Sequence, residues 1–302
     1  MDGRVNAELT HGSVEKVMAK DLRCSLIQSW PWRRGRGALA RALFPRGTRG
    51  RATFKFSFGT FVDAPIDPWP AGYRDLFLFN EFESDQVRLW KLLLKPGDVV
   101  VDGGANLGFW SLVASRLVGP DGLVVAFEPH PETVEELRRN LSASAATNVI
   151  AQPSGLWHSA AFAAMDNGEQ MASRCVAQIR VQTTSGGVAL MDLDGFWLSH
   201  GQLSSRRIAL IKLDVEGSEL GALKGMQRTI ERDRPILTIE WNWETSERFG
   251  FVPSDVREFL AKYGYRAYST DDGALVPFVE PRRQQSPTVW YVHAEHFECC
   301  KV

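Results

Sequence analysis

Long apolar runs are missing from this sequence. No stretch approaches the roughly 20 consecutive apolar residues that a membrane-spanning helix needs. A dominant charge is missing too, because 35 Lys and Arg residues face 36 Asp and Glu residues and leave a net charge of -1. Such a balance provides no general attraction to nucleic acid or to a membrane surface. We therefore expect neither as a partner, and the sequence predicts no particular oligomeric state.

Cysteine is scarce, with four residues in a chain of 302, and none of them has zinc-ligand or Cys-x-x-Cys spacing. Cys24 and Cys175 stand alone, while Cys299 and Cys300 are neighbours. This usage is typical of reduced thiols and predicts a cytoplasmic protein. The opening MDGRVNAELTHGSVEKVM carries acidic residues and no apolar stretch, so we expect neither a signal peptide nor a transit peptide.

The first 75 residues differ in composition from the rest of the chain. Residues 33–51 are basic and interrupted by glycine, which fits either a solvated segment or a site for an anionic substrate or carrier. Residues 54–62 alternate apolar and polar side chains and predict a strand. We expect residues 1–75 to form a partly mobile extension that caps or shapes a substrate site, and residues 76–302 to form the main domain.

Helical spacing predicts a first helix over residues 82–94, and from residue 98 strands and helices alternate. Strands are predicted at 98–104, 123–128, 148–157, 208–214 and 235–241, and helices at 109–117, 131–141, 218–230 and 255–264. A hairpin insertion is predicted from 156–166 and 175–184, and a closing hairpin from 265–270 and 288–294. Repeated strand-helix-strand units predict an α/β fold, a Rossmann-like, doubly wound, mostly parallel sheet with a C-terminal antiparallel hairpin.

The first of these strands runs into a glycine loop whose middle position holds Asn106 instead of glycine. A glycine there lets the backbone approach a pyrophosphate, so Asn106 disfavours NAD and FAD. Glu128 ends the second strand, twenty positions after Gly108, where a carboxylate can accept both ribose hydroxyls of an adenosine. S-adenosylmethionine has an adenosine and no phosphate, and Asp102 can hold its ammonium group directly or through water. A plain strand-to-helix turn would also explain the loop. The predicted cofactor residues are Asp102, Gly103, Gly104, Ala105, Asn106, Gly108, Glu128, Pro129 and His130.

Four stretches in this order carry a resemblance over residues of about 80 to 270: KPGDVVVDGGANLGFWSLVASRL, VVAFEPHPETVEELRRNL, IALIKLDVEGSELGALKGM, and RPILTIE followed by FLAKYGYRAYS. They resemble the FkbM family of S-adenosylmethionine-dependent methyltransferases, and the K-x-D-V-E-G-x-E-L block is the most specific element. Gly103 departs from the family, where an aliphatic residue is usual. The resemblance implies a class I methyltransferase domain that transfers a methyl group to a hydroxyl of a sugar or another natural product. It does not cover the first 75 residues.

The fourth strand presents Lys212, Asp214 and Glu216 in alternation, on one face of an extended chain. We expect Asp214, or else Glu216, to accept the proton of the substrate hydroxyl, and Asp214 is favoured. In the alternative, Lys212 pairs with Asp214 while Glu216 and Glu219 serve the N-terminus of the next helix. His158 is a further candidate base.

The fifth strand ends in four residues that we expect to meet the substrate: Glu240, Trp241, Asn242 and Trp243. Tryptophan faces can stack on sugar rings and favour a sulfonium, although core packing also explains them. A divalent cation held by Asp214, Glu240 and Asn242 is an alternative to a plain base.

Two rival functions remain for comparison with methyl transfer. A nicotinamide-dependent oxidoreductase is disfavoured by Asn106 and by the lack of a Tyr-x-x-x-Lys pair. A nucleic-acid amino-methyltransferase is rejected, because it would need Asp/Asn-Pro-Pro-aromatic after the fourth strand, where this chain has Asp214-Val-Glu-Gly. A catalytically silent S-adenosyl-binding module on the same fold is the second rival, because fold alone does not imply catalysis.

Overall fold

The computed structural model describes residues 26, 39, 42, 43, 51–55, 61–65, 83–165, 179–182 and 187–296. The predicted extension, residues 1–75, therefore lies largely outside the described residues. Two antiparallel strands are described within it, β1 Arg51–Lys55 and β2 Phe61–Pro65, where the alternation had predicted one strand. Val62 of β2 is fully buried in the core of the main domain. In the described part of the chain, no helix has the length and apolar character needed to cross a membrane.

An eight-stranded sheet forms the centre of the main domain, in the order β13-β12-β14-β11-β10-β3-β4-β5. The parallel strands are β3 Val99–Gly103, β4 Leu123–Phe127, β5 Val149–Gln152, β10 Leu210–Leu213 and β11 Ile236–Glu240. The antiparallel strands are β14 Thr288–His293, β12 Tyr265–Asp271 and β13 Ala274–Pro277. This topology confirms the predicted Rossmann-like fold, and β14 lies between β11 and β12 as the closing antiparallel strand.

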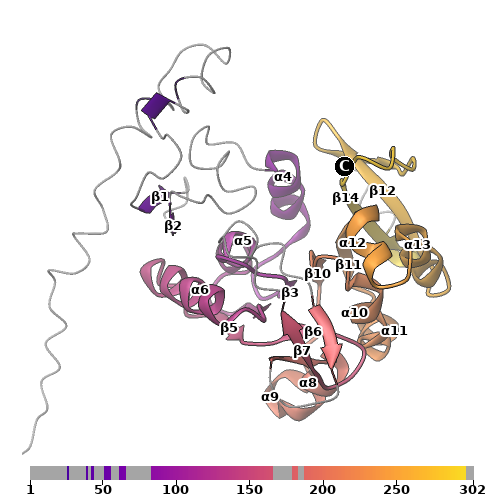
Figure 1. Cartoon of the computed structure of the whole chain (residues 1–302), viewed down its shortest axis with the longest axis horizontal. Helices are drawn as coiled ribbons and strands as arrows, with labels where there is room; N and C mark the ends of the chain where they lie inside the picture. Colours follow the sequence, from indigo (N-terminus) through magenta and orange to yellow (C-terminus); the bar gives the residue numbers. More distant parts are fainter. Residues whose placement is uncertain are drawn as a thin grey trace, which may run out of the picture.

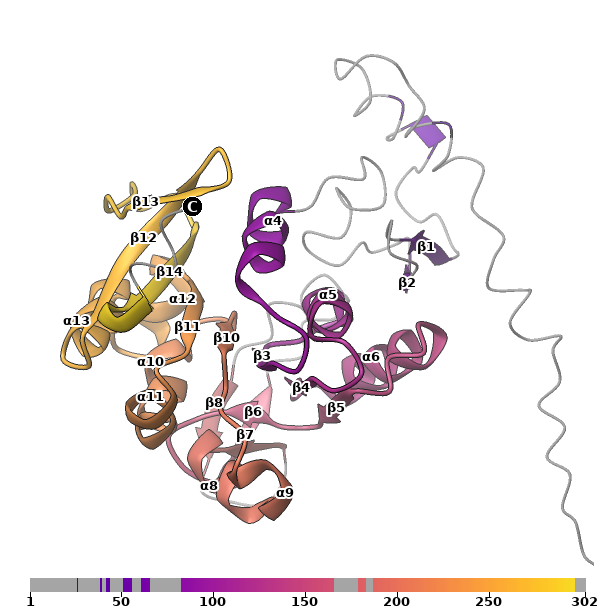
Figure 2. The ribbon, with the colours of Figure 1, turned by 180° about the vertical axis from the view of Figure 1, so that it is seen from behind.

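Helices cover both faces of this sheet, as Figures 1 and 2 show. One core joins the sheet to α4 Ser84–Leu93, α5 Phe109–Val118 and α6 Pro131–Ala143. The other core joins it to α8 Leu193–Ser199, α10 Glu219–Lys224, α11 Gln227–Asp233 and α13 Pro253–Ala261. Because β3 and β4 are apolar on both faces, their side chains contribute to both cores, as expected for buried parallel strands.

The helix predicted over residues 218–230 is broken into α10 and α11. Gly225 follows α10, and a Cβ atom at this position would lie 2.0 Å from the carbonyl oxygen of Trp157. The Asp194 carboxylate then accepts hydrogen bonds from the backbone N–H groups of Arg228 and Thr229, both at 2.9 Å. Asp194 thus stabilises a new helix start, which apolar spacing along the sequence does not reveal.

A four-stranded sheet follows β5 and contains the predicted hairpin insertion. Its strands are β6 Gly155–Leu156, β7 Ala161–Met165, β8 Ile179–Gln182 and β9 Val188–Met191, in the order β6-β9-β7-β8. The antiparallel pairing of β7 with β8 confirms the hairpin. Six of the described elements were not predicted: β9, α8 Leu193–Ser199, α9 Gly201–Ser204, α12 Trp243–Arg248, β13 and the 3-10 turn η2 Ala294–His296.

Candidate functional site

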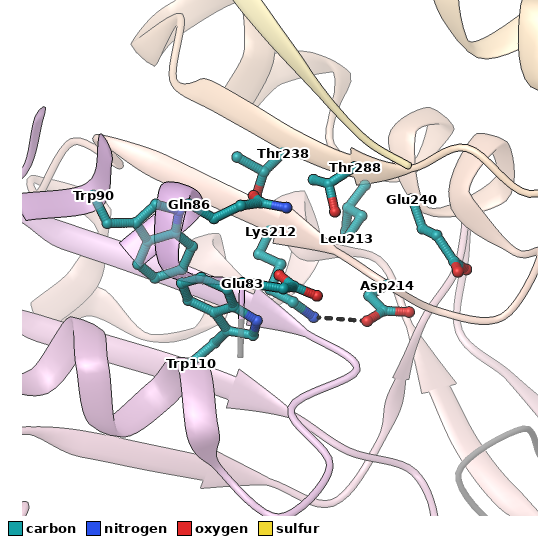
Figure 3. A pocket seen from close by; sticks show the side chains of 10 residues that line it. All are labelled: Glu83, Gln86, Trp90, Trp110, Lys212, Leu213, Asp214, Thr238, Glu240 and Thr288. Atoms are coloured by element: carbon teal, nitrogen blue, oxygen red, sulfur yellow. Dashed lines mark hydrogen bonds and ion pairs between the residues drawn. The ribbon is translucent and has the colours of Figure 1, made fainter. Parts of the chain in front are cut away.

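A pocket lies at the carboxyl ends of β10 and β11, where the beginning of α4 reaches the sheet (Figure 3). Between its protein atoms the pocket encloses room for about one water molecule and otherwise opens to solvent. Ligands of open α/β sheets bind at this edge, so the position fits the prediction. The lining residues are Glu83, Gln86, Trp90, Trp110, Lys212, Leu213, Asp214, Thr238, Glu240 and Thr288.

A buried ion pair joins the two central strands directly below this pocket. Asp102 of β3 lies beside Lys212 of β10 in the parallel register and is fully buried. One carboxylate oxygen, Oδ2, accepts a hydrogen bond of 2.6 Å from the Ser111 hydroxyl, and the other lies 3.7 Å from Lys212 Nζ. Lys212 Nζ also lies 3.3 Å from Asp214 Oδ2. Lys212 therefore pairs with Asp214, as expected in the alternative to a catalytic role for this strand end.

The charge states of Asp102 and Lys212 depend on each other. Burial raises the pKa of Asp102, and the ammonium group of Lys212 acts in the opposite direction. Burial lowers the pKa of Lys212, but Asp214, Asp102 and Glu83 together raise it further than burial lowers it. Lys212 is therefore a cation in the folded protein. Asp102 has no exposed surface.

The glycine loop has a backbone that fits its sequence. Gly104 has φ +75°, and a Cβ atom there would lie 1.9 Å from the carbonyl oxygen of Asp214. Only glycine allows the loops after β3 and β10 to approach so closely. Asn106 has φ +51°, a left-handed conformation that asparagine adopts more readily than most residues. The asparagine in the middle of the loop is therefore explained by its backbone conformation.

Gly103 occupies a crowded position in the same loop. A Cβ atom there would lie 2.9 Å from Leu213 Cδ2 and 3.0 Å from Leu156 Cδ1. These leucine side chains fill the space that an aliphatic residue would need. The departure from the family pattern is thus matched by its neighbours.

Glu128 connects the end of β4 to the glycine loop through hydrogen bonds. It is buried, and its two carboxylate oxygens accept hydrogen bonds of 2.9 Å from the backbone N–H groups of Asn106 and His130. Burial raises the pKa of Glu128 to about 7, although these hydrogen bonds lower it. Each carboxylate oxygen has a second lone pair, so Glu128 can still accept hydroxyl groups from a ligand. Around it, Gly104, Asn106 and Pro129 are partly exposed, while Ala105, Gly108 and His130 are buried.

Carboxyl groups gather at the ends of β10 and β11. Burial raises the pKa of Glu216 to about 8, and Asp214 and Glu219 raise it further. Burial raises the pKa of Glu240 to about 9, and Asp214, Glu216 and Glu219 act in the same direction. Glu240 Oε2 is buried and has no hydrogen-bond partner among the described residues. Carboxyl groups that hold a proton near neutral pH are thus placed at this edge.

Glu219 has a structural position in this group. Its Oε1 accepts hydrogen bonds of 3.2 Å from the backbone N–H groups of Val215 and Gly217, so it closes the turn between β10 and α10. The alternative placed Glu219 at the N-terminus of the next helix, whereas both of these N–H groups precede α10. Glu216, in contrast, has a left-handed backbone with φ +54° in the same turn.

The two tryptophans after β11 lie outside the pocket lining. Trp241 is 1% exposed and packs in the core, with its ring centroid 4.8 Å from that of Phe278. Core packing, the alternative to a stacking platform, therefore describes Trp241. Trp243 is half-buried, and the guanidinium of Arg283 lies 5.5 Å from its ring centroid.

Two other predicted residues also lie away from the pocket. Asn242 does not continue the strand toward a substrate, because β11 ends at Glu240 and the chain turns into α12. Asn242 caps this helix: its Oδ1 accepts hydrogen bonds from the backbone N–H groups of Glu244 and Thr245. His158 is exposed, with its ring 5.1 Å from that of Trp157. Among the described residues, no three His, Cys, Asp or Glu side chains are grouped as metal ligands.

Sequence reasoning missed most of the residues that line the pocket. Glu83 and Gln86 precede the first strand, in a helix that apolar spacing marked only for its buried face. Trp90 and Trp110 lie within the two predicted helices, 82–94 and 109–117. Thr238 had a readable signal, since it is a polar residue between apolar neighbours in the middle of β11. The residues missed are Glu83, Gln86, Trp90, Trp110, Leu213, Thr238 and Thr288.

Comparison with known proteins shows the family of this chain. A family model described as the methyltransferase FkbM domain matches residues 102–267, more than half of the chain. The chain belongs to the FkbM methyltransferase family. The match begins at Asp102 and includes the glycine loop, Glu128, the Lys212–Glu216 block and Glu240. Membership of the FkbM family supports a methyltransferase that uses S-adenosylmethionine.

Individual relatives within and around the FkbM family are distant. The hexuronic acid methyltransferase AglP of Haloferax volcanii is 27% identical over 203 residues, which cover 67% of this chain and 77% of AglP. Methyltransferase 1 of Beauveria bassiana is 29% identical over 147 residues, covering 42% of this chain but only 57% of its own length. The 31-O-demethyl-FK506 methyltransferase FkbM of Streptomyces tacrolimicus is 45% identical over 65 residues, which cover 21% of this chain and 25% of that enzyme.

The raised pKa values predict how stability depends on pH. The folded protein keeps protons on Glu216 and Glu240, with pKa values of about 8 and 9, that the unfolded chain releases near 4.5. Because the folded state binds more protons, its free energy of unfolding should fall as the pH rises through this range. Glu240→Gln should make that fall shallower between about pH 6 and pH 9.

Urea denaturation at a series of pH values measures this effect. Glu258→Gln, which changes an exposed carboxylate on α13, serves as the control and should follow the wild type. An equal pH dependence for Glu240→Gln and the wild type would contradict the protonated state of Glu240.

Proposed function

We propose that this FkbM-family protein is an S-adenosylmethionine-dependent O-methyltransferase that acts on a hydroxyl group of a sugar or another small natural product. The proposal is carried by one juxtaposition: the glycine loop with Glu128 lies beside the Lys212–Asp214 strand end in a single sheet edge. The names of two relatives, a hexuronic acid methyltransferase and a demethyl-FK506 methyltransferase, support an acceptor of this kind. A cytoplasmic location, predicted from the thiols, stays a prediction.

The residues present fit the cofactor. Glu128 offers carboxylate lone pairs for ribose hydroxyls, and the partly exposed Gly104, Asn106 and Pro129 would border the adenosine. The side chain at position 106, where a pyrophosphate needs glycine, disfavours NAD. When bound, S-adenosylmethionine supplies an activated methyl group.

The protein must then orient an acceptor hydroxyl and remove its proton. A positioned base contributes on the order of 10²–10⁴-fold to such a step. We propose Asp214 as this base, because it lines the pocket and its side chain is 45% exposed, so a substrate can reach it. Lys212 Nζ lies 3.3 Å from Asp214 Oδ2.

Cofactor choice can be measured by calorimetry with S-adenosylhomocysteine and with NAD. The protein should bind the first ligand and not the second. Glu128→Ala should weaken binding of S-adenosylhomocysteine by about 1.5–3 kcal/mol, because hydrogen bonds to a charged group are lost. Glu135→Ala, an exposed residue on α6, is the control and should bind like the wild type. Tight NAD binding, or an unchanged affinity for Glu128→Ala, would contradict this assignment.

Methyl transfer itself can be followed with labelled S-adenosylmethionine and a panel of neutral sugars, hexuronic acids and hydroxylated natural products. Asp214→Asn keeps the size of the side chain but removes its basicity. The rate should fall about 10²-fold or more at neutral pH, with little change in cofactor affinity. Assays with Mg²⁺ or with EDTA distinguish a plain base from a metal-assisted one. A near-normal rate in both conditions would leave Glu216, Glu240 or His158 as the base.

A further inference from the structure

Trp157, which follows β6, packs closely against α10. A Cβ atom at Gly221, in the first turn of α10, would lie 2.1 Å from Cζ3 of the Trp157 ring. At Gly225, directly after this helix, a Cβ atom would lie 2.0 Å from the Trp157 carbonyl oxygen. Because α10 follows the carboxyl end of β10, its first turn lies at the edge of the sheet where ligands bind. The Trp157 side chain therefore extends along α10 toward that edge.

The Trp157 ring is only half-buried and keeps its polar group free. It packs against the small core of the insertion, which consists of Ala163, Val188 and Leu190. Its indole N–H donates no hydrogen bond to the described residues and is not enclosed by them. A tryptophan in this position offers an apolar face together with a hydrogen-bond donor. Such a surface suits a ligand that has an apolar face and polar groups at its rim.

Two further aromatic rings lie beside Trp157. The ring centroid of the exposed His158 is 5.1 Å from that of Trp157, and the centroid of the half-buried Phe249 is 5.9 Å away. The planes of these rings are inclined to Trp157 by 42° and 50°. We call the three residues the aromatic platform. Because Phe249 follows α12, the platform joins two segments that are far apart in the sequence.

The end of α12 connects the aromatic platform to the turn after β10. A Cβ atom at Gly217 would lie 2.3 Å from the carbonyl oxygen of Thr245, so α12 packs directly against this turn. Arg248 ends α12 and precedes Phe249, and its charge acts on that of Glu216 in the same turn. Since Asp214 lies two residues before Glu216, a molecule bound on the platform would lie on the side of the proposed base.

We propose that the aromatic platform binds the ring of a sugar acceptor, with the C–H face of a pyranose on Trp157. The hydroxyl groups of this sugar would meet the Trp157 indole N–H and the Arg248 guanidinium, which has donors beyond its ion pair with Glu244. A purely apolar ligand would leave these donors without partners, and a simple anion would not use the rings. This assignment rests on the proposed function and deepens it, because it names the surface that selects the acceptor.

Saturation-transfer NMR with methyl β-D-glucopyranoside and methyl β-D-glucuronide tests this site in the protein with S-adenosylhomocysteine bound. The two probes share a pyranose ring and differ in charge. In the wild type, saturation should reach the ring C–H protons of at least one probe. Trp157→Ala and Phe249→Ala should each weaken binding of that probe about tenfold, and Trp157→Phe, which keeps an aromatic face, should retain part of the affinity. By calorimetry, all three variants should bind S-adenosylhomocysteine like the wild type.

Phe162→Ala is the matched control, because it removes an aromatic ring that is 45% exposed on β7 of the same small sheet. It should bind the probes and S-adenosylhomocysteine like the wild type. A wild type that binds S-adenosylhomocysteine but neither probe would overturn the proposal, and so would unchanged probe binding by Trp157→Ala.

A Trp157→Ala variant that loses both kinds of ligand has lost more than the platform, and Phe249→Ala then decides. A loss of probe binding alone in Phe249→Ala supports the platform, and any other result overturns it. If the wild type does not bind S-adenosylhomocysteine, the proposed function fails first, and this inference fails with it.

Discussion

The buried ion pair between Asp102 and Lys212 is the constraint on which the site depends. A carboxylate without exposed surface loses several kcal/mol of hydration, and the structure repays it with the Ser111 hydroxyl and the Lys212 ammonium. The parallel register of β3 and β10 places these two residues side by side. The pair therefore fixes where each central strand ends and which residues follow at the sheet edge.

The chemistry of the site follows from that register. Two residues beyond Lys212 lies Asp214, whose carbonyl oxygen approaches Gly104 so closely that only glycine fits. The two loops that border the proposed cofactor are thus locked together by backbone contact. Lys212 is shared between Asp102 below and Asp214 above, which leaves one aspartate structural and the other accessible. Asp102 and Asp214 thus contact the same lysine, but the first is buried and the second is exposed to solvent.

Much of this arrangement could be predicted from the sequence, because it depends on local patterns. Apolar strands of five residues, the glycine loop and the spacing to Glu128 define the central sheet and its carboxyl edge. The break between α10 and α11 could not be predicted, because it depends on Asp194, a residue more than thirty positions away. The pocket wall formed by Glu83 and Gln86 is hidden for the same reason. Nothing in the apolar pattern of α4 shows which end of the helix meets the carboxyl ends of the strands. The sequence around Asn242 is typical of a strand end and does not show that its side chain caps α12.

A double-mutant cycle on Asp102 and Lys212 tests the central constraint most directly. Lys212→Met leaves the Asp102 charge buried without its counter-ion and should lower the free energy of unfolding by about 3–5 kcal/mol. Adding Asp102→Asn removes that charge, so the double variant should be more stable than the sum of the two single effects predicts. Urea denaturation of the four proteins measures the coupling. Strictly additive effects would contradict the account, because the two side chains would then not depend on each other.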